Sequence, residues 1–324
     1  MNWAEKIIVA GQSDGLVAAI VRTLIKQGHP VSRIVAATPD VLDFTNQLAV
    51  RQFFEQEQPQ QFYMAAARVG VLRPHGRYSP DVIYDHLMVQ ANAIHTAFRN
   101  GAKKLLFLGS SFGPPRQVSQ HLAPDTLFTR LLDPLPEPYT AVRGAGIKLC
   151  ESYNRQYGQS HGVDYRSVVP ALLYDPLNPL HPEHSPLVFA LVRRFHEARM
   201  QRQAGVGFGC SGAERIELLH VDDLARGCVF VMNLPRPAHD ACTGPLQSHI
   251  NVGHGRDISL AELASTVAGV VGYQGEIWFE HGPATGNPRK PLDSARLRAL
   301  GWSPKVSLQD GLLAAYKNHL ARWA

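Results

Sequence analysis

Short apolar runs alternate with longer amphipathic stretches through the first half of the chain. The runs contain few polar positions, which is typical of strands buried on both faces of a sheet. We expect strands over residues 6–10, 31–37, 61–66, 104–109 and 165–169. We expect helices over residues 15–27, 48–57, 81–98 and 140–157. This alternation predicts an α/β fold with a doubly wound parallel sheet, whose ligand sites lie at the carboxyl ends of the strands.

The pattern changes after Pro170. The following stretch, LLYDPLNPLHPEHSP, is rich in Pro and His, so we expect it to be largely loop. Further helical segments are expected over residues 187–203, 259–271 and 293–300, ahead of a C-terminal helix. We therefore predict a dinucleotide-binding domain over residues 1–170 plus about 216–250. A smaller α+β substrate domain would take residues 171–215 plus 251–324.

The composition is that of an ordinary soluble globular chain. Its 324 residues are 45% hydrophobic and 18% charged, enough for a large core. The net charge of +5 is scattered and forms no basic stripe, so no nucleic acid is expected as a partner. Four cysteines lack C-x-x-C spacing and fifteen histidines show no ligand constellation, so no metal site is expected. A signal peptide and an apolar run of the roughly 18–20 residues that span a membrane are both missing, which favours a cytoplasmic protein without membrane contact.

The first predicted strand ends in a turn that could cradle a pyrophosphate. The turn runs from Gly11 to Ala18 as GQSDGLVA, and its glycines would let backbone N–H groups approach a phosphate closely. Asp14 puts a carboxylate near the expected phosphate, so a helix start that binds no dinucleotide is the alternative. Asp40, after the second strand, could bind a ribose hydroxyl or merely cap a helix. No arginine lies beside it, which disfavours NADP.

Candidate chemistry follows the fourth strand. Ser110 closes that strand, and its hydroxyl could bond a substrate carbonyl or only form a turn. Tyr139 and Arg143 are four residues apart on a predicted helix, so they share a face. A tyrosine can donate a proton to a carbonyl that is being reduced, and a neighbouring cation favours its ionised form. Arg143 keeps that charge, but its planar fork differs in shape from an ammonium group.

Long motifs carry a resemblance to a known family. Residues 109–158 and the segments LLYDPLNPLHP, RRFHEA, HVDD, INVGHG and NPRKPLD resemble the GDP-L-fucose synthases, which are extended short-chain dehydrogenases. The resemblance covers essentially the whole chain. It implies a Rossmann-like fold, a GDP-sugar pocket, NADP or NAD as cofactor, and a homodimer formed through the helices near Tyr139 and over 81–98. Members of that family epimerise GDP-4-keto-6-deoxy-mannose at C3 and C5 and then reduce C4 with NADPH.

The resemblance also implies roles for single residues. Ser110 and Tyr139 fall on the family's catalytic serine and tyrosine, and Arg143 replaces its lysine. The cysteine and histidine that serve epimerisation fall on Phe112 and Pro186, neither of which can transfer a proton. The resemblance therefore favours reduction over epimerisation.

The two binding sites differ in how well they match. The family's later turn glycines fall on Asp14 and Val17, and its NADP-phosphate arginines fall on Ala37 and Pro39. The cofactor contacts implied here are Gly11, Gly15, Asp40, Ala65 and Ala66. The substrate contacts implied are His181, Arg194, Arg215 (offset by one position), Arg289 and Lys290. The departures thus fall on the cofactor and proton-transfer positions, while the GDP-sugar side is mostly retained.

Three hypotheses follow. The chain could reduce C4 of a GDP-4-keto-6-deoxy sugar without epimerisation, with Tyr139 as the acid, Ser110 as the carbonyl donor and Arg143 beside them. It could instead be a catalytically silent GDP-sugar-binding homologue or a partner subunit. It could also run a redox-free reaction in the sugar pocket, with a histidine of residues 181–196 as the base.

Overall fold

A parallel sheet organises the first part of the molecule. The computed structural model describes residues 5–11, 14–65, 80–109, 137–176, 187–280 and 291–323. Within them, a six-stranded sheet has the order β10-β5-β4-β3-β1-β2, and every neighbouring pair is parallel. Its strands are β1 (Ile7–Gly11), β2 (Ile34–Ala37), β3 (Gln61–Ala65), β4 (Lys104–Leu108), β5 (Asp164–Pro170) and β10 (His249–Val252). The predicted doubly wound parallel sheet is confirmed.

The strand order reverses beside β1. From β1 the chain moves outward to β2 and then returns to β3 on the other side of β1. Doubly wound sheets bind ligands outside the carboxyl ends of the strands at such a reversal. Gly11 and Ala65 end β1 and β3 as partners in register, so they mark this position. The strand expected over 31–37 is shorter, because Val31–Arg33 form a 3-10 turn after Pro30.

Helices cover both faces of the sheet, as its buried strands require. One pair of helices in contact is α1 (Asp14–Lys26) and α7 (Val221–Asn233). A second group in contact comprises α2 (Gln47–Glu57), α3 (Pro80–Arg99) and α5 (Glu137–Tyr157). Helices α1, α2, α3 and α5 match the predicted ones within a few residues, whereas α7 was not predicted. Asn46 begins α2 as an N-cap, since its side chain accepts the N–H groups of Leu48 and Ala49.

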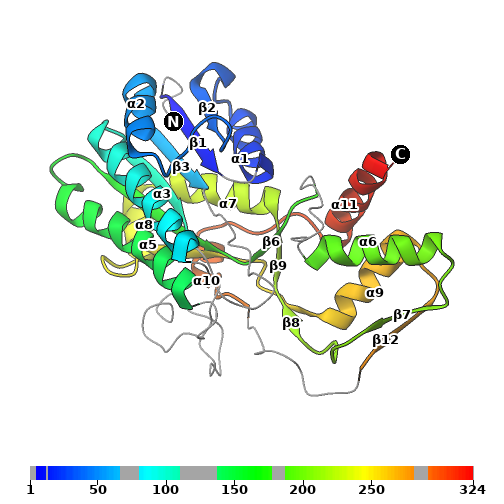
Figure 1. Cartoon of the computed structure of the whole chain (residues 1–324). Coiled ribbons are helices and arrows are strands. Elements are labelled where there is room, and N and C mark those ends of the chain that lie inside the picture. The colour runs from blue at the N-terminus through cyan, green and yellow to red at the C-terminus, as the bar shows by residue number, and fades with distance from the viewer. Residues whose placement is uncertain are drawn as a thin grey trace.

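The second part of the molecule gathers away from α2, α3 and α5 (Figure 1). It contains the helices α6 (Leu187–Met200), α9 (Leu260–Val271) and α11 (Leu308–Trp323). Strand β7 (Gly205–Phe208) pairs there with β12 (Glu276–Phe279). Its apolar core includes Val192, Phe195, Leu263 and Leu312. Helix α6 ends three residues before the predicted 203, and Arg202 then adopts a left-handed conformation with φ of 52°.

Short strands and helices make up the rest of the described chain. Strand β6 (Leu172–Tyr174) pairs in parallel with β9 (Leu218–His220), and β8 (Arg215–Ile216) pairs with β11 (Ile258–Ser259). The remaining helices are α8 (Arg236–Cys242) and α10 (Ala295–Ala299). Leu292, Leu297 and Trp302 belong to the core of the six-stranded sheet. The domain boundaries given above stay a prediction.

Candidate functional site

The turn after β1 is closely packed against β3. A Cβ atom at Gly11 would lie 2.6 Å from a methyl carbon of Val17 and 3.3 Å from the carbonyl oxygen of Ala65. Glycine at position 11 is therefore needed for β1, α1 and β3 to meet at this point. That close approach fits a turn that brings backbone N–H groups up to a phosphate. Gly11 and Ala65 thus lie together, whereas Ala66 is outside the described residues.

Gly15, in the first turn of α1, faces an unexpected partner. A Cβ atom built on Gly15 would lie 1.4 Å from Oδ2 of Asp175, so the carboxylate occupies the space that a side chain would fill. Asp175 follows β6 directly and is 7% exposed. A carboxylate at a helix N-terminus is favourable, because the partial charge there is positive. The carboxylate thus lies at the helix start that was expected to receive a pyrophosphate.

Asp40 lies in the exposed segment after β2. The hydroxyl of Thr38 donates a hydrogen bond to its Oδ1. This bond holds the pKa of Asp40 below the ordinary value of an aspartate. The carboxylate is therefore ionised and fixed near the end of β2, where it can accept a bond from a ribose hydroxyl.

Arg143 is buried at the carboxyl end of β4. It lies on α5 and is 1% exposed, and its Nη2 donates a hydrogen bond to the carbonyl oxygen of Leu108. The guanidinium carbon lies 5.0 Å from the centroid of the Phe107 ring, within the range of a cation–π contact. Tyr139 lies in the first turn of the same helix, four residues earlier, and its side chain is outside the described residues, as is Ser110. A buried cation is thus fixed one helical turn from the candidate acid.

Helix α5 approaches β4 through another glycine. A Cβ atom at Gly146 would lie 2.3 Å from the Phe107 ring and 2.7 Å from the side-chain oxygen of Gln90. The amide of Gln90 donates to the carbonyl oxygen of Val142 at 2.7 Å. This packing sets the depth at which Arg143 meets the end of β4.

The described substrate candidates lie in the second part of the molecule. Arg194 on α6 donates to the carbonyl oxygen of Gly207, and its guanidinium carbon lies 4.5 Å from the Phe208 ring centroid. Arg215 on β8 forms an ion pair of 2.6 Å with Asp257. Both arginines are exposed and keep donors for an anion. The candidates His181, Arg289 and Lys290 are outside the described residues.

A histidine expected near the pocket lies in the smaller core instead. His196 on α6 is 8% exposed, and its Nδ1 lies 3.1 Å from the hydroxyl of Tyr316. Burial lowers its pKa, so the ring is neutral near pH 7. His196 is therefore placed to pack against α11 rather than to act as a base.

Sequence reasoning did not single out Glu217, a buried carboxylate between β8 and β9. It accepts the backbone N–H groups of Gly255 and Leu292, each at 2.7 Å. Burial raises its pKa. The sequence around Glu217, three residues before the segment HVDD begins, did not mark it as buried and bonded. The N–H groups that it accepts come from residues that are remote in the sequence. Asp175 gave no signal either, because it belongs to the stretch after Pro170 that was expected to be largely loop.

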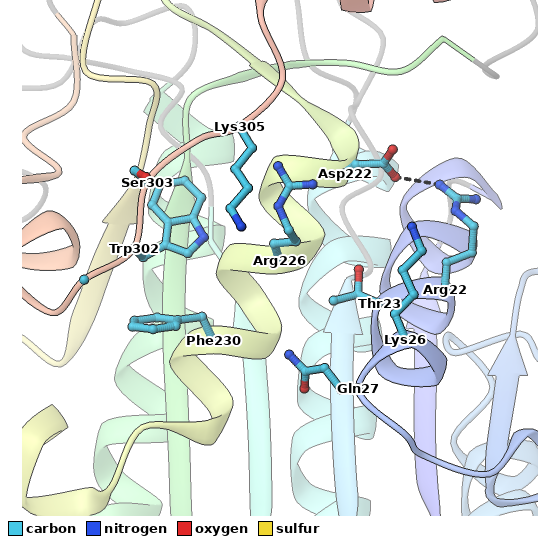
Figure 2. Close-up of a pocket in the computed structure, with 11 residues that line it drawn as sticks. Arg22, Thr23, Lys26, Gln27, Asp222, Arg226, Phe230, Trp302, Ser303 and Lys305 are labelled. Atoms are coloured by element: carbon cyan, nitrogen blue, oxygen red, sulfur yellow. Dashed lines mark hydrogen bonds and ion pairs between the residues drawn. The ribbon is translucent and has the colours of Figure 1, made fainter.

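A separate hollow of about 350 Å³ lies between α1, α7 and residues 301–305. Figure 2 shows Lys305, Arg226 and Trp302 gathered on one side of it, with Lys26 on the other. Buried Asp223 accepts the N–H groups of Lys305 and Val306 at 2.7 and 3.0 Å. These bonds fasten the segment after Trp302 to the start of α7. None of the described residues predicted for cofactor or sugar lines this hollow.

Within the described ranges, no group of three or more His, Cys, Asp or Glu side chains could hold a metal ion. The four cysteines are free, and burial raises the pKa of Cys150 and of Cys228 to about 12. No helix in the described part of the chain is long and apolar enough to cross a membrane.

Comparison with known proteins shows relatives that match this chain over nearly its whole length. The model of the family described as "NAD dependent epimerase/dehydratase family" matches residues 7–253. The GDP-L-fucose synthase of Escherichia coli (strain K12) is 43% identical over 313 residues, which is 97% of this chain and 96% of that protein. GDP-L-fucose synthase 1 of Arabidopsis thaliana is 41% identical over 98% of this chain and 94% of its own length.

Solved structures agree with the sequence relatives. A GDP-mannoheptose C4 reductase from Campylobacter jejuni with NADP bound is 30% identical, with a TM-score of 0.84 and 99% of each chain covered. A GDP-D-glycero-L-gluco-heptose synthase from the same organism, in the presence of NADPH, is 29% identical, with a TM-score of 0.86 and 99% of each chain covered. The predicted resemblance to the GDP-L-fucose synthases is confirmed, and the chain belongs to the NAD dependent epimerase/dehydratase family.

Proposed function

We propose that this chain binds a GDP-linked 4-keto-6-deoxy sugar and reduces its C4 carbonyl without epimerisation. The relatives named above support GDP-sugar chemistry on this fold, and one of them is a C4 reductase. Phe112 and Pro186 replace the residues that the resemblance assigns to epimerisation, and neither side chain can exchange a proton.

The observation that carries the proposal is the placement of Arg143. Its guanidinium is held at the carboxyl end of β4 by Leu108 and Phe107. Tyr139 lies four residues earlier on α5, and residues at this spacing share a helix face. A cation on that face favours the tyrosinate, so Tyr139 can give its proton to the C4 oxygen. Ser110 follows β4 closely and would hydrogen-bond the same oxygen.

The dinucleotide would be held by Gly11, Gly15, Asp40, Ala65 and Ala66. When bound, a nicotinamide dinucleotide supplies the hydride for such a reduction. NAD suits the segment after β2 better than NADP, because the resemblance places Ala37 and Pro39 where the family has phosphate-binding arginines. Arg194 and Arg215, with Arg289 and Lys290, would bind the diphosphate of the GDP-sugar.

The reaction can be tested with GDP-4-keto-6-deoxy-mannose and either NADPH or NADH. We expect oxidation of the dinucleotide and a GDP-6-deoxy sugar that keeps its configuration at C3 and C5, read by NMR. Tyr139→Phe should lower turnover by about 10²–10⁴-fold, the usual contribution of a general acid. A product inverted at C3 or C5 would refute the proposal, and so would turnover unchanged in Tyr139→Phe.

A second candidate is a catalytically silent GDP-sugar-binding homologue or partner subunit. The Asp175 carboxylate against Gly15 favours it, because that contact opposes a dinucleotide. Titration with GDP-mannose, NADPH and NADH separates the two candidates. GDP-mannose binding without a response to either dinucleotide supports the silent homologue, whereas binding of both ligand types supports the reductase.

A further inference from the structure

One carboxylate of this chain lies where a ligand's phosphate is expected. Asp175 Oδ2 lies 1.4 Å from the position that a Cβ atom of Gly15 would take. Gly15 is in the first turn of α1, beside the reversal of strand order between β1 and β3. Helix N-termini at this point of a doubly wound sheet bind phosphate groups through their free N–H groups and positive partial charge. The carboxylate therefore lies against the helix terminus that a pyrophosphate would otherwise use.

We propose that Asp175 is a built-in competitor of the dinucleotide: its carboxylate occupies the anion-binding end of α1, and the dinucleotide binds only when Asp175 withdraws. The inference rests on the proposed function for its choice of ligand. Two anions cannot share this terminus, because like charges in contact repel strongly. The apparent affinity for the dinucleotide is then reduced by the fraction of molecules in which the position is open.

The neighbours of Asp175 hold it in this place. Tyr174, the residue before it, is 3% exposed and ends β6, which pairs with β9. The Tyr174 ring meets the His220 ring edge to face at 5.2 Å between centroids. The Tyr174 hydroxyl lies 2.1 Å from where a Cβ atom of Gly311 would be, so α11 also encloses it. Withdrawal of Asp175 thus requires a backbone change after Tyr174 or a new side-chain rotamer, not a drift of the whole strand.

The binding test compares full-length wild type, Asp175→Gly and Asp175→Asn by nicotinamide fluorescence with NADPH and NADH. Removing the carboxylate should tighten dinucleotide binding by about tenfold or more, as expected for relief of close like-charge contact. Asp175→Asn keeps the size and removes the charge, so it should recover part of the gain. Asp240→Asn, an exposed carboxylate on α8, is the matched control and should bind as wild type does. Equal affinity of wild type and Asp175→Gly would overturn the proposal.

A second measurement tests the contact without any ligand. Gly15→Ala should lower the melting temperature of the wild-type chain, because the new methyl group meets the Asp175 carboxylate. In an Asp175→Gly background the same substitution should cost much less. If Gly15→Ala lowers the melting temperature equally in both backgrounds, the carboxylate does not occupy this position and the proposal is wrong.

GDP-mannose binding separates this inference from the proposed function. Unchanged GDP-mannose affinity in Asp175→Gly, together with gained dinucleotide binding, supports the competitor. Retained GDP-mannose affinity with no dinucleotide binding in Asp175→Gly overturns the competitor and leaves the sugar site standing. A chain that gains dinucleotide binding but never binds GDP-mannose supports the competitor and contradicts the sugar substrate.

Discussion

At the scale of single residues, Arg143 has two roles. It packs the junction of α5 and β4, and its charge is proposed to act on Tyr139. Its planar guanidinium stacks on Phe107 and donates to Leu108, and both contacts stabilise the junction of α5 and β4. A lysine would keep the charge but lose the planar stacking. The guanidinium therefore suits the packing of this junction better than an ammonium group would.

Arg143→Lys should move stability and activity in opposite directions. We expect the free energy of unfolding to fall by about 1 kcal/mol, because the guanidinium's planar stacking on the Phe107 ring is lost. Reductase turnover should rise, since an ammonium group reaches a ribose hydroxyl and a tyrosinate more freely. Urea denaturation gives the first quantity and dinucleotide oxidation gives the second. A variant that is both less stable and less active would show that the guanidinium itself serves the site.

At the scale of elements, the close contact between α5 and β4 depends on the glycine at position 146. Gly146→Ala should destabilise the fold by about 1–3 kcal/mol, because the methyl group would overlap the Phe107 ring. Gly269→Ala in α9 is the matched control, since a Cβ there meets nothing within 4 Å. The control should stabilise the protein by about 0.5–1 kcal/mol through helix propensity. Thermal unfolding of both variants checks the pair, and equal shifts would contradict the packing argument.

The resemblance implies a homodimer, and the outer face of α3 is a candidate for its interface. Tyr84 and Leu87 are 62% and 40% exposed there, three residues apart on one face. We propose that a homodimer covers this face. Leu87→Glu should then give a monomer by light scattering, while Leu313→Glu on α11, also 40% exposed, should leave the dimer intact. A monomeric wild type would contradict this proposal.

The sequence predicted some secondary-structure elements and missed others. Strands β1, β3, β4 and β5 were predicted because each is a run of residues buried on both faces. Strands β6 to β9 and β12 have two to four residues and pair with distant segments, so no local pattern marks them. For the same reason Gly15 was predicted as a site residue and its contact with Asp175 was not. The stretch 172–186 was expected to be largely loop, yet its first three residues form β6.

At the scale of the whole molecule, acid should weaken the fold. Burial lowers the pKa of His319 from 6.5 to about 4, and it also lowers the pKa values of His196 and His220. Between pH 6.5 and 4 the unfolded chain therefore binds protons that the native chain does not, so the free energy of unfolding falls as pH falls. His319→Gln should lose less stability over this interval in urea titrations. If the free energy of unfolding depends on pH equally in this variant and in the wild type, His319 is not the cause of the acid weakening.

The bonds of Glu217 and Asp223 have a consequence for how the protein is made. Both carboxylates are buried, and their backbone donors include Leu292, Lys305 and Val306 near the end of the chain. These donors leave the ribosome last. Until then, Glu217 and Asp223 lack part of the hydrogen bonds that compensate for their burial. A product that stops before residue 291 would keep every strand of the six-stranded sheet but lack these donors. Premature termination late in the gene should therefore yield an insoluble or rapidly degraded chain rather than a smaller working protein.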